Sequence, residues 1–243
     1  MRDDRREELA TRLAAVRERI AAACAAAGRD PSEVALLAVT KTVPASDVAM
    51  LVDLGLTAFA ENRAQEAGAK VAEVADLRPD ATPRWHFVGG FQRNKAKAVA
   101  RWADRVESVD SVRLADALDD AVRREQDAGG RADRLDVLLQ YSVDGDPARH
   151  GVARDGLLPL AEHVASCAGL HLAGLMSVAP LGSDPDAAFA DVAEAAAALH
   201  AAFPQASALS AGMSGDLEAA IRHGSGVVRV GTALVGERRL TSP

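Results

Sequence analysis

Short apolar runs alternate with longer amphipathic stretches along this chain. Eight apolar or β-branched runs predict strands at 34–40, 57–60, 85–88, 105–109, 135–143, 170–178, 207–211 and 226–235. Between them, apolar residues at helical spacing predict helices near 45–55, 63–76, 94–103, 111–128, 155–168, 185–203 and 215–222. This alternation is typical of a parallel sheet, and eight repeats favour a closed barrel. We therefore predict an α/β fold, a single (β/α)8 TIM barrel.

A doubly wound open sheet is the alternative, but no Gly-x-Gly-x-x-Gly follows the first strand, which weakens its dinucleotide-binding version. A further helix is predicted before the first strand, over 4–27. Asp3 or Asp4 could cap its start, and Gly28 could end it. We expect this helix to pack over one side or end of the barrel. Nothing along the chain resembles a linker, so we expect residues 1–243 to form one domain.

Composition narrows the class of protein. With 243 residues, 49% hydrophobic and 26% charged, the chain can bury a sizeable core. A net charge of −7 and only 3% aromatic residues argue against nucleic-acid or anionic-membrane surfaces. Cys24 and Cys167 lie in Ala-rich helical patterns, which predicts buried, reduced thiols. No segment resembles a secretory signal or a membrane span, so we expect a cytoplasmic enzyme or small-molecule binding protein.

Lysine is scarce, and Lys41 closes the first apolar run. Of 28 basic side chains, four are lysines and the rest are arginines. A lysine amine can form an imine with an aldehyde once it loses its proton, whereas an arginine guanidinium cannot. By position alone, a strand-end lysine that reaches solvent is the commoner case. The residues at the other strand ends distinguish between these two interpretations of Lys41.

The last two strand ends carry residues suited to a phosphate. Barrels frequently bind phosphate with the loops after strands seven and eight and a helix N-terminus. Ser214, in the Gly212–Asp216 run, offers a hydroxyl directly before a helix, and Gly231 with Thr232 allows close backbone approach and adds a second hydroxyl. The alternative is ordinary helix capping by Ser214 or Asp216. Both sites together favour phosphate binding.

Arg229 shares a strand face with Gly231, because side chains alternate along a strand. If that face is the barrel interior, the buried cation requires an acceptor. A carboxylate inside the barrel and a ligand acceptor, such as a ring nitrogen or an anion, both remain open. An imine-forming lysine, a phosphate site and this arginine match the aldehyde, phosphate and pyridine nitrogen of pyridoxal 5′-phosphate (PLP).

Ordered motifs resemble the pyridoxal phosphate homeostasis family of the YggS/PROSC type. They are Leu36–Thr42, Glu61–Glu66, Trp85–Gly89 with Gln92–Lys95, Leu175–Met176, Gly212–Asp216 and Val228–Thr232. The resemblance covers roughly residues 5–240. Departures include Arg63 where tyrosine is common, Ala60 in place of glycine, Ala211 where methionine is frequent, and Gly89–Gln92 in place of the commoner Gly-x-Leu-Gln.

The resemblance implies a barrel related to the N-terminal domain of alanine racemase, with PLP held as an aldimine of Lys41. It also implies that Asn62 lies near the cofactor. Ser214, Gly231 and Thr232 would hold the phosphate, and Arg229 would face the pyridine nitrogen. The family maintains PLP supply without an established catalytic turnover. PLP-dependent apo-enzymes are the expected recipients, and we expect a monomer.

Physical arguments favour a carrier over an enzyme. Arginine does not protonate the ring nitrogen, because its pKa lies above about 12, and an unprotonated ring is a weaker electron sink. The only tyrosine, Tyr141, is predicted to lie in the barrel wall. His86, between two aromatic residues, is predicted to be a hydrogen-bonded barrel histidine. A racemase-like enzyme, a Schiff-base aldolase acting on a phosphorylated sugar and a plain scaffold remain the alternatives.

Overall fold

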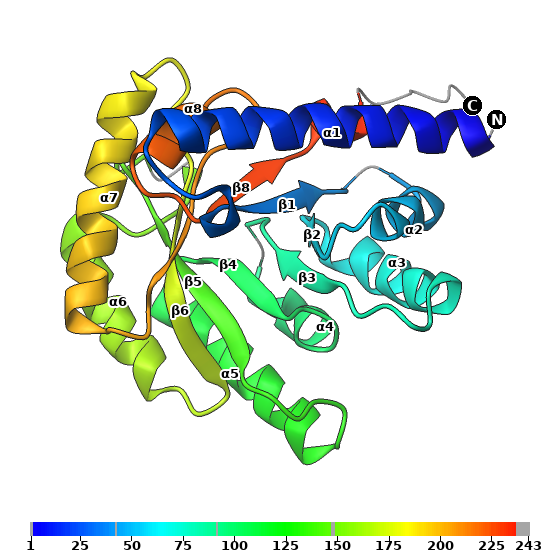
Figure 1. The fold of residues 1–243 in the computed structure, drawn as a ribbon. Helices are drawn as coiled ribbons and strands as arrows, with labels where there is room; N and C mark the ends of the chain where they lie inside the picture. The colour runs from blue at the N-terminus through cyan, green and yellow to red at the C-terminus, as the bar shows by residue number, and fades with distance from the viewer. Residues whose placement is uncertain (1, 42, 91, 147–148, 237–243) are drawn as a thin grey trace.

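Eight parallel strands form a closed barrel in chain order (Figure 1). The computed structural model describes residues 2–41, 43–90, 92–146 and 149–236. The strands are β1 (Ala35–Val39), β2 (Ala58–Glu61), β3 (Arg84–Phe87), β4 (Arg105–Val109), β5 (Leu135–Tyr141), β6 (Leu170–Ser177), β7 (Ala208–Ser210) and β8 (Val227–Val230). Because β1 pairs with β8, the first and last strands are neighbours. The predicted (β/α)8 barrel is confirmed, and the open-sheet alternative is wrong.

Helices surround the barrel (Figure 1). They are α1 (Arg2–Ala26), α2 (Ala45–Asp53), α3 (Ala64–Leu77), α4 (Ala96–Ala100), α5 (Val112–Asp127), α6 (Arg154–Ser166), α7 (Pro185–Ala202), α8 (Leu217–Arg222) and α9 (Thr232–Val235), with 3-10 turns η1 (Pro31–Glu33) and η2 (Arg93–Lys95). In the described part of the chain, none of them is both long and apolar enough to cross a bilayer.

Most of the apolar core lies between the strands and the helices. One large cluster joins β4–β7 to α5–α7, and a second joins β1, β2 and β8 to α1, α2 and α8. Inside the barrel the packing changes character, because the buried side chains there include His86, Glu107, Ser210 and Arg229. These polar groups require hydrogen-bond partners within the barrel. The interior is therefore the place to look for chemistry.

The first helix, α1, packs against α2, α8 and α9 on the β1–β8 side of the barrel (Figure 1). Its apolar stripe is buried, as the periodicity predicted. Gly28, at φ +67°, follows the helix end in a conformation that favours glycine. The predicted capping role of Asp3 or Asp4 is wrong, because both lie inside the first turn of α1. There they face the positive end of the helix dipole.

The main error in the predicted elements concerns the eighth strand. It was expected to span 226–235, but β8 ends at Val230 and the following residues form α9. The Gly231 carbonyl accepts hydrogen bonds from the amides of Leu234 and Val235, at 2.8 and 2.9 Å. The apolar run continues through this turn, so hydropathy alone does not reveal the change from strand to helix. Both predicted thiols are buried and free.

Candidate functional site

The predicted site residues lie at the carboxyl ends of adjacent strands. Lys41 follows β1, Asn62 follows β2, the Ser214 loop follows β7, and Thr232 follows β8. Strand pairing runs β7–β8–β1–β2 around the closed barrel. Barrel closure therefore brings together one arc of the mouth from segments at opposite ends of the sequence. This is the end of a (β/α)8 barrel where active sites are built.

Lys41 lies in a turn just beyond β1, and its side chain is exposed. Backbone pairing with β2 continues to Thr40, whose amide donates to the Ala60 carbonyl at 3.0 Å. On β1, Leu37 pairs with the inward-facing Arg229. Lys41 lies two residues beyond the end of β1, at the carboxyl end of the barrel. The neighbouring motif residue Thr42 lies outside the described residues.

A buried cluster fixes the backbone that carries Lys41. The Lys70 amine, on α3, donates to the Thr40 carbonyl at 2.7 Å and to Glu61 Oε1 at 2.8 Å. The Thr40 hydroxyl donates to the same carboxylate oxygen at 2.8 Å. Sequence reasoning did not assign Lys70 this role. The sequence feature that could have revealed it is Glu61, a charged residue within the buried β2 run. A buried carboxylate needs a cation, and Lys70 lies on the helix that follows.

Asn62 presents a buried acceptor at the mouth. Its side-chain oxygen has no hydrogen-bond partner among the described residues. Gly89 packs against the Asn62 backbone so closely that a Cβ there would lie 2.5 Å from the Asn62 carbonyl oxygen. Buried polar atoms are nearly always paired in folded proteins. An unpaired oxygen at this place is what a residue that contacts a ligand would show.

The loop after β7 is held without using the Ser214 hydroxyl. Gly212 adopts φ +88°, and a Cβ there would lie 2.5 Å from the Ala220 side chain. The Asp216 carboxylate accepts a hydrogen bond from the Met213 amide at 2.6 Å. Asp216 is the N-cap residue of α8, so the capping alternative is confirmed for Asp216 and wrong for Ser214. The Ser214 hydroxyl has no partner among the described residues and is available to a ligand.

Helix α1 steadies this loop from outside the barrel. The Arg19 guanidinium donates to the Ser214 carbonyl at 2.6 Å and to Glu218 Oε2 at 2.7 Å. The ion pair holds the pKa of Glu218 below its usual value. No sequence motif pointed to Arg19, because the contact joins residues almost two hundred positions apart. The additional helix therefore contributes to the shape of the site.

The turn after β8 completes this arc. Gly231 lies against β1, where a Cβ would sit 3.5 Å from Val39. The Arg229 amide donates to the Gly212 carbonyl at 2.9 Å, which ties β8 to the loop after β7. The Thr232 side chain is exposed, and its hydroxyl has no partner in the described part of the chain. Two hydroxyls and two glycine-containing turns thus lie on neighbouring strand ends.

Arg229 is buried inside the barrel at 4% exposure. Its Nη1 donates to the Ser210 hydroxyl at 2.8 Å, and its Nη2 donates to the Ser177 carbonyl at 2.7 Å. Glu107 Oε2 lies 3.9 Å from Nη1 and accepts from Ser210 at 2.6 Å. The interior carboxylate that a buried arginine requires is therefore present.

His86 completes this network, because its Nδ1 lies 2.7 Å from Glu107 Oε1. The predicted hydrogen-bonded barrel histidine is confirmed. Burial opposes the charge of Glu107, but the hydrogen bond and charge of His86, the charge of Arg229 and the hydrogen bond from Ser210 hold the pKa of its carboxyl below the usual value. Burial in turn lowers the pKa of Arg229, against the pull of Glu107. An arginine nevertheless stays protonated in proteins, so the interior holds a fixed cation beside an anion.

Tyr141 does not belong to the site. Its hydroxyl donates to Asp191 on α7 at 2.8 Å, and Arg154 lies over its ring. Burial and the neighbouring carboxylate raise the pKa of the phenol. The side chain therefore points into the helical layer, which confirms the predicted position in the barrel wall.

Comparison with known proteins agrees with the barrel fold described above. The family model for the alanine racemase N-terminal domain matches residues 11–239. The pyridoxal phosphate homeostasis protein of Mycobacterium tuberculosis is 49% identical over 99% of this chain and 96% of its own length. The chain belongs to the pyridoxal phosphate homeostasis protein family. The Escherichia coli K12 member is 38% identical over 95% of this chain and 97% of its own length.

A solved structure extends the comparison. PipY of Synechococcus elongatus, determined with PLP bound, is 34% identical to this member of the pyridoxal phosphate homeostasis family. The match has a TM-score of 0.78 and covers 94% of this chain and all of PipY, 100%. The family resemblance inferred from the ordered motifs is therefore confirmed.

Replacing Glu107 by Gln tests the interior network. The variant leaves Arg229 buried without its carboxylate, so we expect the free energy of unfolding at neutral pH to fall by about 3 kcal/mol. The pKa of Glu107 is lower in the folded state than its ordinary 4.5. Its charge therefore stabilises the fold fully above the unfolded-state pKa, and this contribution is lost as pH falls through the folded-state pKa. Urea unfolding at neutral pH and below 4.5 should show a steeper acid loss in wild type than in the variant.

Glu33→Gln is the matched control, because the Glu33 side chain is 54% exposed and pairs only with Arg29 on the surface. We expect it to change the free energy of unfolding by less than about 0.5 kcal/mol. Equal stability of wild type and Glu107→Gln at neutral pH would contradict the proposed dependence of Arg229 on Glu107.

Proposed function

We propose that this chain binds PLP at the mouth of its barrel, as an aldimine of Lys41, and passes the cofactor to PLP-dependent apo-enzymes. One observation carries the proposal. Barrel closure gathers an exposed amine, two hydroxyls without described partners and a buried arginine on adjacent strand ends. PLP bound to PipY, a relative at 34% identity, supports this choice of ligand.

The amine is the first part of the fit. Of the two lysines near the end of β1, Lys70 is engaged by Glu61 and by the Thr40 carbonyl. An ammonium held by a carboxylate is a poor nucleophile, because its lone pair is protonated. Lys41 has no such partner among the described residues. It would condense with the aldehyde of PLP and release one water molecule.

The phosphate and the ring are the second part. The Ser214 and Thr232 hydroxyls, with the backbone of Gly231, would hold the phosphate, since turns with close backbone approach suit anions. Asn62 would contact the cofactor through its unpaired side-chain oxygen. Arg229 would face the pyridine nitrogen. When bound, PLP supplies electron withdrawal from the carbon next to the imine, and this is strongest with a protonated ring.

The same residues favour a protein that carries PLP over an enzyme that uses PLP in catalysis. Arg229 does not supply a proton to the ring, because guanidinium has a pKa above about 12. Racemisation also needs acid–base groups on both faces of the substrate, and Tyr141 is bonded to Asp191 in the helical layer. An exposed Lys41 leaves the imine open to water, so hydrolysis can return the cofactor to a recipient. The recipient enzymes, the monomeric state and the cytoplasmic location remain predictions.

Absorbance titration with PLP tests the anchor. Wild type should develop the yellow imine band, and Lys41→Ala should not, because Lys70, the other lysine near the end of β1, is engaged by Glu61 and the Thr40 carbonyl. Lys97→Ala, at an exposed lysine on α4, is the matched control and should behave as wild type. Borohydride reduction followed by peptide mass analysis should place the adduct on Lys41.

An unchanged imine band in Lys41→Ala would overturn the assignment, and a colourless wild type would favour the aldolase alternative.

The phosphate contacts are tested by comparing PLP with pyridoxal, which lacks the phosphate. Ser214→Ala and Thr232→Ala should each weaken PLP binding about tenfold or more, since hydrogen bonds to charged groups contribute about 1.5–3 kcal/mol. Their affinity for pyridoxal should stay unchanged. Equilibrium titration with both ligands measures the ratio of the PLP affinity to the pyridoxal affinity for each variant. A parallel loss for PLP and pyridoxal would mean that these residues act on the fold and not on the phosphate.

A further inference from the structure

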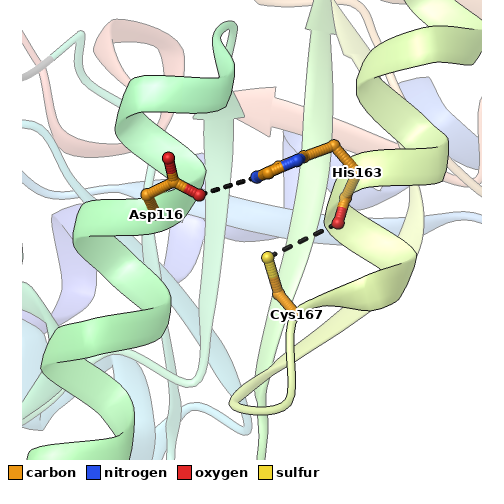
Figure 2. A group of neighbouring side chains, drawn as sticks. All are labelled: Asp116, His163 and Cys167. Atoms are coloured by element: carbon orange, nitrogen blue, oxygen red, sulfur yellow. Dashed lines mark hydrogen bonds and ion pairs between the residues drawn. The ribbon is translucent and has the colours of Figure 1, made fainter.

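A second group of reactive side chains lies in the helical layer, outside the barrel. Asp116 comes from α5, His163 from α6, and Cys167 directly follows α6 (Figure 2). One carboxylate oxygen, one ring nitrogen and the sulfur all lie within 4.8 Å of one another. Figure 2 shows the carboxylate and the ring facing each other across the two helices, with the thiol beside them. Within the described residues, this is the one His, Cys and carboxylate group of that kind.

Local structure holds the three donors in place. His163 and Cys167 are four positions apart, so they lie on one face at the end of α6. His163 Nε2 lies 2.7 Å from Asp116 Oδ1. The Gly169 amide donates to Asp119 on α5 at 2.6 Å, which fixes the turn after Cys167. The donors are therefore gathered before any ion arrives.

An ion pair between His163 and Asp116 accounts for only two of the three donors. The Cys167 thiol is buried at 8% exposure, yet its hydrogen bond is a weak one, 3.5 Å to the carbonyl of His163 on α6. Asp116 is 57% exposed and His163 is 33% exposed, so an ion can reach the group from solvent. The other buried thiol, Cys24, lies in an apolar cluster and belongs to no comparable group of ligand atoms among the described residues.

We propose that Asp116, His163 and Cys167 bind a zinc ion between α5 and α6. Sulfur, imidazole and carboxylate ligands suit Zn²⁺, and three protein ligands leave a fourth, tetrahedral position for water. On binding, the thiol releases its proton to solvent as the zinc–sulfur bond forms, the proton shared between the His163 ring and Asp116 leaves the atoms that coordinate zinc, and no electrons are transferred. Burial, with Asp119 and Asp116 nearby, raises the pKa of the thiol to about 11. The metal thus replaces a proton that the thiol otherwise retains.

The site is separate from the PLP site. Cys167 lies shortly before the start of β6, at the amino end of the strand, whereas Lys41 and Thr232 lie at carboxyl ends. Zinc would fasten the end of α6 to α5 and so hold the helical layer over β5 and β6. The proposal does not depend on the proposed function, because its readouts do not involve PLP.

Metal titration of the full chain, with any purification tag removed, tests the proposal. Cobalt(II), used as a spectroscopic probe, should give a thiolate-to-metal charge-transfer band and the intense visible bands of a tetrahedral site. Zinc should abolish these bands at one equivalent. Competition against a chromophoric chelator should show zinc affinity reduced by more than about 100-fold in Cys167→Ala and in Asp116→Asn, since even changes in the groups around the ligands cost 10–100-fold.

Asp116→Asn changes an exposed side chain, so it tests the site even if Cys167→Ala folds poorly. Two control variants show whether the loss of affinity is specific to Asp116, His163 and Cys167. Cys24→Ala removes the other buried thiol, and His223→Ala removes a histidine that pairs with Asp186 at 3.0 Å. Both controls should keep the zinc affinity and the cobalt spectrum of wild type. A cobalt spectrum without a thiolate band, or zinc affinity equal in Cys167→Ala and Cys24→Ala, would overturn the proposal.

Discussion

The rest of the structure depends on one buried cation, Arg229, inside the barrel. A guanidinium that has left water needs charge and hydrogen-bond partners around it. The barrel supplies Ser177 from β6, Ser210 from β7 and Glu107 from β4, and His86 from β3 holds the carboxylate. This network makes the barrel interior polar and links five strands. It also places a permanent cation in the barrel interior, paired with Glu107, that cannot act as an acid.

The outer layer serves the same site by fixing its loops. Arg19 on α1 holds the loop after β7 through the Ser214 carbonyl. Lys70 on α3 holds the end of β1 through the Thr40 carbonyl. Both cations use backbone carbonyls, so they set the position of the chain and leave the Ser214 hydroxyl and the Lys41 amine unengaged. The helices thus position ligand groups without occupying them, which suits a protein that binds and releases a cofactor.

Strand periodicity predicted the barrel because apolar runs and helical stripes repeat along the chain. The places of the proposed site residues on neighbouring strand ends could be predicted, because barrel chemistry gathers at strand ends and ordered motifs marked Lys41 and the later loops. The partners could not, since contacts such as Arg19 with Ser214 join distant segments. The turn at Gly231 was missed because the apolar run continues into α9. The Asp116 and His163 pair was missed because it forms only when α5 and α6 pack together.

We propose that PLP at this site keeps an unprotonated ring nitrogen, because Arg229, which would face that nitrogen, cannot release its proton. Nitrogen-15 NMR of the protein loaded with ring-labelled PLP measures that state directly. The account predicts the chemical shift of an unprotonated pyridine, constant over the pH range in which the ring of free PLP titrates. A pyridinium shift at neutral pH would contradict it and would restore the electron sink that an enzyme requires.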